Sequence, residues 1–241
     1  MSLLDGDHAR LVEAALPVCA AYGLAIAGGY AVKAHGLVER PSEDIDFATA
    51  TTASLDEIMA ALAGAYTSAG YDVEVLDVDA RKGYLLVTFP LSGTYRVDVL
   101  KEPLNHPLEQ TRYGPVIALA DAVALKMGAL HDRGLPRDLL DVHGAAAHFT
   151  APELVSLCRA ALDDEFSLET LRDQLSYAAM YPDEAFARYG CPPDEIVAVR
   201  AWAQEWSTQI GLDIAEAAPW SDDPDDSGDP DDEELNGGLD E

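Results

Sequence analysis

The sequence predicts an α/β fold, in which a core with a mixed β-sheet precedes a C-terminal bundle of α-helices and a disordered acidic tail. Strand and helix patterns alternate through residues 1–103, whereas almost every pattern beyond Pro115 has helical periodicity. Residues 221–241 carry eleven acidic residues, no basic residue and no apolar periodicity, a composition typical of disorder. We therefore expect a core at 1–103, a helical domain at 104–220 and a tail at 221–241.

The elements of the core are expected in a regular order. An amphipathic helix near residues 5–22 ends at Gly23, and Leu24-Ala-Ile-Ala27 has the apolar character of a short buried strand. The loop Glu102-Pro-Leu-Asn-His-Pro107 separates the core from the helical part. The remaining predictions are, in chain order, a helix from about Leu55 to Ala69, strands at Tyr71–Val78, Gly83–Phe89 and Tyr95–Leu100, and helices at 118–131, 137–148, 151–163, 167–179 and 193–210.

An Asp-x-Asp pair is the feature of the core that points most directly to chemistry. Side chains alternate between the two faces of a strand, so Asp44 and Asp46 face one way while Ile45 and Phe47 face a core. Two neighbouring carboxylates repel each other unless a cation lies between them, and Mg²⁺ favours one or two carboxylates together with substrate phosphates. The pair therefore predicts a Mg²⁺ site, with Mn²⁺ as the alternative ion. The competing interpretation is an acidic face exposed to solvent.

A third carboxylate is available on a later strand. In Tyr95-Arg-Val-Asp-Val-Leu100, Asp98 alternates with Val97 and Val99 and so lies on the opposite face from them. If this strand lies beside the Asp44–Asp46 strand, the three aspartates can hold the metal, and Asp98 can act as general base towards an attacking hydroxyl. Taken alone, Asp98 would be a charge on an edge strand.

The glycine doublet before the acidic strand predicts an anion site. Gly28 and Gly29 allow a sharp turn and a close approach of the backbone to a ligand. The helix that is expected to start at Tyr30 would then present its N-terminus to a phosphate. A phosphate site beside a metal site would serve a nucleoside triphosphate, although a Gly-Gly pair is more commonly a plain turn.

Two stretches of the chain resemble a known family. The first combines, in order, Gly28, Gly29, His35, Arg40, Ser42, Asp44 and Asp46. The second combines Lys126, in an apolar helix, with Arg133, Arg137, Asp138 and Asp141. Both lie within about residues 24–145 and resemble the AbiEii-type nucleotidyltransferase toxins, a branch of the polymerase-beta-like nucleotidyltransferase superfamily that includes the mycobacterial MenT proteins. The wider superfamily often has Gly-Ser where this chain has Gly28-Gly29.

The resemblance implies a polymerase-beta-like nucleotidyltransferase core and transfer of a nucleoside monophosphate from a nucleoside triphosphate (NTP) to an acceptor hydroxyl. The acceptor that it implies is the 3′ end of tRNA, and a cognate antitoxin would be the regulator. The residues that it assigns to metal binding and catalysis are Asp44, Asp46 and Asp98, joined in catalysis by Lys126. The residues that it assigns to substrate binding are Gly28, Gly29, Arg40, Ser42, Lys126 and Asp141.

Simpler interpretations compete for several of these residues. Lys126 could extend its ammonium group from the apolar helix to water, and Asp141 could pair with Arg137 one turn earlier. Arg40 could serve the turn before Pro41 instead of clamping a phosphate. His35 is interpreted as a packed or hydrogen-bonding residue rather than a catalyst.

Cysteine usage and hydropathy indicate the compartment. Cys19, Cys158 and Cys191 are far apart and match no metal-binding spacing, so we expect buried thiols in a reducing cytosol. The N-terminus has no secretory character, and no segment has the length and apolarity of a transmembrane helix. These features predict a cytoplasmic protein without a membrane partner.

The charge distribution leaves the acceptor open. The net charge of −29 opposes binding of RNA, but ten of the fifteen basic residues lie between Lys33 and Arg137, around the expected site. An acidic surface would also suit a cationic small molecule, as in antibiotic-modifying nucleotidyltransferases. A non-catalytic nucleotide-binding protein is the remaining alternative, and the intact set of aspartates together with Lys126 argues against it.

Overall fold

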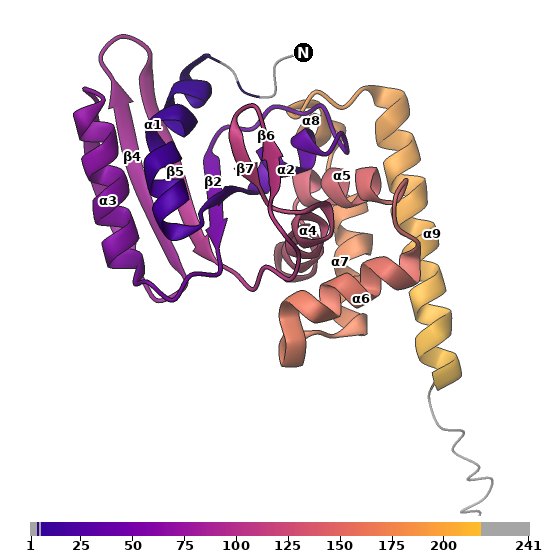
Figure 1. Ribbon diagram of the computed structural model, residues 1–241. Helices are drawn as coiled ribbons and strands as arrows, with labels where there is room; N and C mark the ends of the chain where they lie inside the picture. Colours follow the sequence, from indigo (N-terminus) through magenta and orange to yellow (C-terminus); the bar gives the residue numbers. More distant parts are fainter. Residues whose placement is uncertain (1–3, 5, 218–241) are drawn as a thin grey trace, which may run out of the picture.

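The computed structural model describes Leu4 and residues 6–217, which form a seven-stranded mixed sheet and a set of helices (Figure 1). The strand order is β3-β4-β5-β2-β1-β7-β6. The predicted α/β class with a mixed sheet is therefore confirmed, and the predicted acidic tail lies outside the described residues. The strands are β1 (Ala25–Ile26), β2 (Ile45–Thr49), β3 (Asp72–Val78), β4 (Lys82–Phe89), β5 (Gly93–Lys101), β6 (Glu109–Thr111) and β7 (Gly114–Val116).

The helices of the first half of the chain pack on the sheet. Those of the second half gather beside the part of the sheet that is formed by β2, β1, β7 and β6 (Figure 1). Helices α1 and α3 contact each other and the strands, whereas α2 contacts both β2 and α4 and so joins the two parts. The helices are α1 (Gly6–Tyr22), α2 (Gly28–Ala34), α3 (Leu55–Ser68), α4 (Leu119–Arg133), α5 (Pro136–Ala145), α6 (Ala151–Leu162), α7 (Leu168–Ala179), α8 (Asp183–Ala187) and α9 (Pro193–Ala217), with a short 3-10 turn η1 at Asp163–Glu165.

Alternation along β4 separates a packed face of the sheet from an open one. Gly83, Leu85 and Val87 are buried, whereas the intervening residues are partly exposed. A Cβ atom at Gly83 would lie 2.9 Å from the Met59 side chain of α3, which shows how closely that helix approaches the strand. The α3 side is therefore the packed face, and the polar side chains of β4 point to the other face.

The pairing of β2 with β5 decides which side chains meet. The two strands are parallel, with Asp46 opposite Asp98 and Phe47 opposite Val99. Because successive side chains of a strand alternate between the two faces of the sheet, Phe47 and Val99 face the buried core while the two aspartates share the opposite face. The neighbouring strands that the carboxylate hypothesis required are therefore present.

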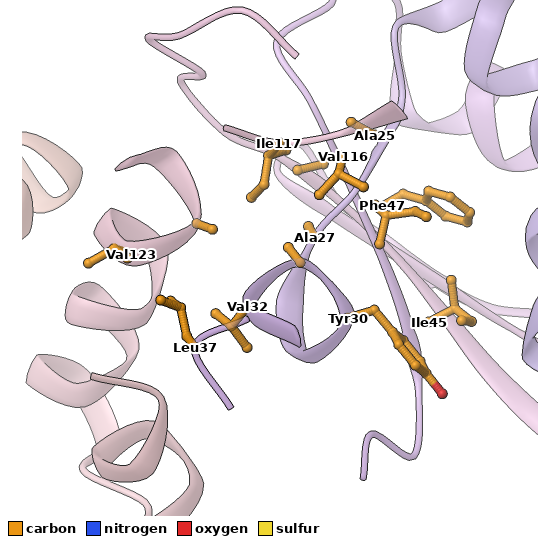
Figure 2. Close-up of a cluster of buried hydrophobic side chains, with 14 of the residues drawn as sticks. Ala25, Ala27, Tyr30, Val32, Leu37, Ile45, Phe47, Val116, Ile117 and Val123 are labelled. Atoms are coloured by element: carbon orange, nitrogen blue, oxygen red, sulfur yellow. The ribbon is translucent and has the colours of Figure 1, made fainter. Parts of the chain in front are cut away.

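A buried cluster anchors α2 between the sheet and the helical part. Figure 2 shows Val32 and Leu37 between the strand residues and Val123 of α4, with Phe47 next to Val116. All of these side chains are buried. This packing fixes the position of the glycine doublet at the start of α2 relative to both β2 and α4.

Several elements differ from the sequence-based expectation. Helix α2 begins at Gly28 rather than at Tyr30, and α9 continues to Ala217. The hairpin β6–β7 and the short helix α8 were not predicted, because elements of three to five residues carry too little periodicity to detect. Strand β7 pairs with β1 in parallel, so the sheet continues past residue 103. The division at residues 103 and 220 stays a prediction.

Candidate active site

A cavity of about 330 Å³ opens where β2 and β5 meet the helical part. Its lining combines the acidic face of the strands with residues of α2, α4 and α5. Eight of the nine predicted site residues line it, namely Gly28, Gly29, Arg40, Ser42, Asp44, Asp46, Asp98 and Lys126. The ninth, Asp141, lies behind the wall with no exposed side-chain surface.

The acidic pair lies at the N-terminal end of β2. Asp44 immediately precedes the strand, and Asp46 is its second residue. Burial raises the pKa of Asp46, although the positive charge of Lys126 opposes this shift. Burial also raises the pKa of Asp44, and the nearby carboxylates of Asp46 and Asp98 raise it further. A site that raises the pKa of adjacent carboxylates is one in which a cation would relieve their repulsion.

The glycine doublet makes room for two side chains of the site. Gly28 has a φ of +56°, and a Cβ atom there would lie 1.8 Å from a carboxylate oxygen of Asp46. A Cβ atom at Gly29 would lie 2.5 Å from the hydroxyl of Ser42. The glycines are thus required by the close approach of Asp46 and Ser42, a constraint that the sequence did not reveal, and they still line the cavity.

The loop before β2 is held by two hydroxyl groups. Ser42 Oγ donates a 3.4 Å hydrogen bond to the Asp44 carbonyl, and the Tyr30 hydroxyl donates a 3.5 Å bond to the Ser42 carbonyl. The Ser42 side chain is therefore engaged with the loop that carries Asp44. His35 donates from Nε2 to the Ile117 carbonyl at 2.9 Å, which confirms its interpretation as a hydrogen-bonding residue.

Asp141 joins two cations behind the cavity wall. Arg40 donates two hydrogen bonds of 2.6 Å to it, and Lys126 Nζ lies 2.9 Å from its Oδ2. Burial alone would raise the pKa of Asp141, but the charges of Lys126 and Arg40 hold that pKa below the usual range. Asp141 therefore pairs with these two residues and not with Arg137, and Lys126 is buried in the wall rather than extended to water. Two cations share one carboxylate, so the cluster keeps one positive charge beside the cavity.

Asp98 is paired with a neighbouring arginine. Arg96 donates to both carboxylate oxygens, at 2.6 and 3.1 Å, and Lys82 Nζ lies 3.9 Å away. The Arg96 guanidinium also lies 4.2 Å from the centre of the Tyr84 ring. Within the described part of the chain, no three acidic, histidine or cysteine side chains are gathered closely enough to hold a metal. The three aspartates share one cavity, but Asp98 faces Arg96 in this arrangement.

The donor set nevertheless fits a hard divalent cation. Asp44 and Asp46 offer carboxylate oxygens only, and burial raises the pKa of each, so a bound cation would offset the cost of their charges. Oxygen ligands of this kind suit Mg²⁺ and Mn²⁺. Asp98 can add a third carboxylate once Arg96 has another anion to bind.

Basic side chains face the carboxylates across the cavity. The Arg137 guanidinium makes no hydrogen bond or ion pair within the described residues, unlike that of Arg133, which donates to Asp138 at 2.8 and 2.9 Å. Sequence reasoning did not select Arg137, although its position next to Asp138 in the second motif could have indicated it. The basic residues of the lining are Arg40, Lys82, Arg96, Lys126, Arg133 and Arg137. The lining also includes Tyr189 from the turn after α8, which no sequence pattern indicated.

The family of the chain follows from a sequence comparison. The family described as "Nucleotidyl transferase AbiEii toxin, Type IV TA system" matches residues 18–210, a range that contains the entire cavity lining. The chain belongs to the AbiEii family. It is accordingly a nucleotidyltransferase and a toxin of a type IV toxin–antitoxin system. A comparison with curated protein sequences gives no match.

Solved structures share the fold of this AbiEii chain. The nucleotidyltransferase toxin MenT4 from Mycobacterium tuberculosis H37Rv is similar with a TM-score of 0.56 and 20% identity, over 84% of each chain. JHP933 from Helicobacter pylori is similar with a TM-score of 0.51 and 18% identity, over 87% of this chain and 93% of that one. At these identities the similarity establishes the fold. Among the described helices of the AbiEii chain, none combines the length and apolarity needed to cross a bilayer.

Proposed function

We propose that this AbiEii-family enzyme transfers a nucleoside monophosphate from an NTP to the 3′ end of tRNA, with Mg²⁺ or Mn²⁺ held by Asp44, Asp46 and Asp98. The observation that carries the proposal is the cavity itself, in which three aspartates face six basic side chains. A triphosphate needs both halves of this lining, because its charge must be neutralised by basic groups while a metal is held by acidic ones.

The basic half of the lining binds the phosphates. Arg137 has no ion-pair partner among the described residues, and the Arg40–Asp141–Lys126 cluster keeps one positive charge. Asp141 acts as a positioning residue, since its buried carboxylate fixes Lys126 at the cavity wall. When bound, the divalent cation would neutralise charge on the phosphates and on the departing pyrophosphate.

Asp98 accepts the proton of the attacking hydroxyl. The acceptor oxygen forms a bond to the α-phosphorus while the bond from that phosphorus to the pyrophosphate oxygen breaks, and the hydroxyl proton passes to the Asp98 carboxylate. Arg96 forms an ion pair with this carboxylate, with Nε 2.6 Å from Oδ1. Its guanidinium is partly exposed and can transfer to a phosphate oxygen, which frees Asp98 for the reaction.

The acceptor and the regulator are supported by different evidence. The tRNA acceptor rests on the resemblance of the two sequence motifs to the MenT branch. A cognate antitoxin is supported by the family description, which names a type IV toxin–antitoxin system. We place the enzyme in the cytoplasm, in keeping with Cys19, Cys158 and Cys191, which are all free and buried.

Incorporation of label into tRNA tests this function. The purified protein is incubated with total tRNA, Mg²⁺ and each α-³²P-labelled NTP in turn, alongside Asp46→Ala and Asp77→Asn. Asp77 is the matched control, because it is an exposed aspartate of the same sheet that does not line the cavity. It lies opposite Tyr84 of β4, which in turn lies opposite Asp98 of β5. Label on tRNA with the wild type and Asp77→Asn but not with Asp46→Ala supports the proposal. Absence of label with every NTP overturns the tRNA acceptor, and label on an aminoglycoside instead would identify the small-molecule alternative.

A further inference from the structure

A second cavity, of about 360 Å³, adjoins the catalytic cavity. The two cavities share Arg40, Pro41 and Tyr189, which form the partition between them. The other walls of the second cavity come from the loop after α2, from α5 and from the start of α9. A ligand whose phosphates occupy the first cavity can therefore place its remaining part in the second.

The partition presents an aromatic surface. The Tyr189 ring is half-buried, with the Arg40 guanidinium carbon 5.7 Å from its centre. The guanidinium of exposed Arg188 lies 5.2 Å from the same centre. Nucleobases stack both on tyrosine rings and on arginine planes, so the ring and its two guanidinium neighbours offer a stacking surface to a base.

The lining of the second cavity contains carboxylates that accept hydrogen bonds and repel phosphate. The carboxylates of Glu39 and Glu195 line it, while the charge of Arg40 is already matched by Asp141. His143 lines it too, and its imidazole makes no hydrogen bond with the described residues; the ring lies edge-on to Trp202 at 5.2 Å. Burial lowers the pKa of His143, so the imidazole is neutral and adds no positive charge.

We propose that the second cavity is the nucleobase site of the incoming NTP, with the base stacked on Tyr189 and its edge directed to Glu195 and His143. This inference rests on the proposed function and names the nucleotide class that it uses. A carboxylate accepts a hydrogen bond from an exocyclic amino group but repels a carbonyl oxygen. Cytosine, adenine and guanine each carry an exocyclic amino group, whereas uracil carries none, so the site selects CTP, ATP and GTP over UTP.

Equilibrium binding without any acceptor tests the nucleobase site. Isothermal titration calorimetry in Mg²⁺ measures Kd for the four NTPs and for inorganic tripolyphosphate, which occupies only the phosphate part. The wild type is expected to bind CTP, ATP and GTP about tenfold more tightly than UTP. Tyr189→Ala is expected to weaken the binding of CTP, ATP and GTP by roughly 5- to 100-fold and to leave the binding of tripolyphosphate unchanged.

Conservative variants separate recognition from folding. Tyr189→Phe keeps the ring and should retain the wild-type Kd, whereas Glu195→Gln should reduce the preference for amino-bearing bases. Asp194→Asn is the matched control, because Asp194 is an exposed neighbour in the first turn of α9 that does not line the cavity. A thermal unfolding midpoint close to the wild type verifies that each variant is folded.

The outcomes separate this inference from the proposed function. If NTPs bind but Tyr189→Ala leaves every NTP affinity unchanged, the nucleobase site is wrong while the transferase stands. A variant effect confined to the KM for acceptor RNA also overturns it, because the cavity would then hold a base of the acceptor. If the wild type binds neither tripolyphosphate nor any NTP, the proposed function itself fails.

Discussion

Arg40 and Asp141 are 101 residues apart in the sequence and form a bidentate ion pair, with Nε and Nη2 of Arg40 each 2.6 Å from a carboxylate oxygen of Asp141. Lys126 reaches the same carboxylate from α4. The pair thus links the loop before β2 to α5 and holds the helical part against the sheet. Removal of the shared anion would leave two buried cations without a counter-charge.

Asp141→Asn is therefore expected to lower the free energy of unfolding by about 3–5 kcal/mol, since breaking a buried ion pair leaves uncompensated charge. Urea denaturation measures the change. Asp173→Asn, which removes an exposed partner of Arg172, should change stability by less than about 0.5 kcal/mol. Equal stability of the two variants would contradict the structural role given to Asp141.

Gly28→Ala should reduce transfer activity about 100-fold, because the added methyl group displaces Asp46 from its position. Gly70→Ala is the matched control: Gly70 also has a positive φ, of +89°, but nothing lies within 4 Å of its added Cβ, and it lines neither cavity. The control should cost about 1 kcal/mol of stability through backbone strain and keep its activity. Steady-state kinetics of the two variants decide the matter, and similar losses in both would show that strain alone is responsible.

Asp46→Asn should abolish transfer and yet stabilise the fold near pH 7. Burial raises the pKa of Asp46 in the folded protein above its ordinary value of 3.8, so the folded state binds this proton more tightly than the unfolded state. The cost of the charge is present above the folded pKa and disappears below pH 3.8, where the carboxyl is protonated in both states. The variant should gain roughly 1 kcal/mol near pH 7, and the gain should shrink to zero as the pH falls through this window. Urea titrations of both proteins between about pH 3 and about pH 7 measure the difference in the free energy of unfolding. A gain independent of pH would exclude this explanation.

Arg96→Gln should tighten the binding of Mn²⁺ by about tenfold, because it removes the cation that competes for Asp98. Electron paramagnetic resonance of free Mn²⁺ gives the Kd. Arg172→Gln, which removes a charge from an exposed pair outside the cavity, serves as the control. Weaker binding in Arg96→Gln would show that Arg96 does not compete with the metal.

The face of its strand on which each side chain lies could be predicted from the sequence. The contacts between distant elements could not. Alternation correctly placed Asp98 on the other face of its strand from Val97 and Val99, since neighbouring side chains on a strand face opposite ways. The partner of Asp141 was missed because a turn-to-turn pair with Arg137 is local, whereas Arg40 reaches it only through the tertiary fold. Local spacing carries no information about such a contact.

The glycine doublet shows the same limit from another direction. The sequence predicted a special backbone position at Gly28 and Gly29, and the positive φ of Gly28 agrees. The physical demand, however, comes from Asp46 and Ser42, whose side chains occupy the space of a Cβ atom. Tyr189 was missed for a different reason, because it follows a helix of only five residues.

The span of the catalytic cavity along the chain, from Gly28 to Tyr189, bears on how the toxin is made. A ribosome adds residues from the N-terminus, and the early strands can pair before the helices that complete the wall exist. Until Asp141 has been synthesised, Arg40 and Lys126 lack the anion that holds them in place. The catalytic cavity consequently remains incomplete until the greater part of the chain has been produced.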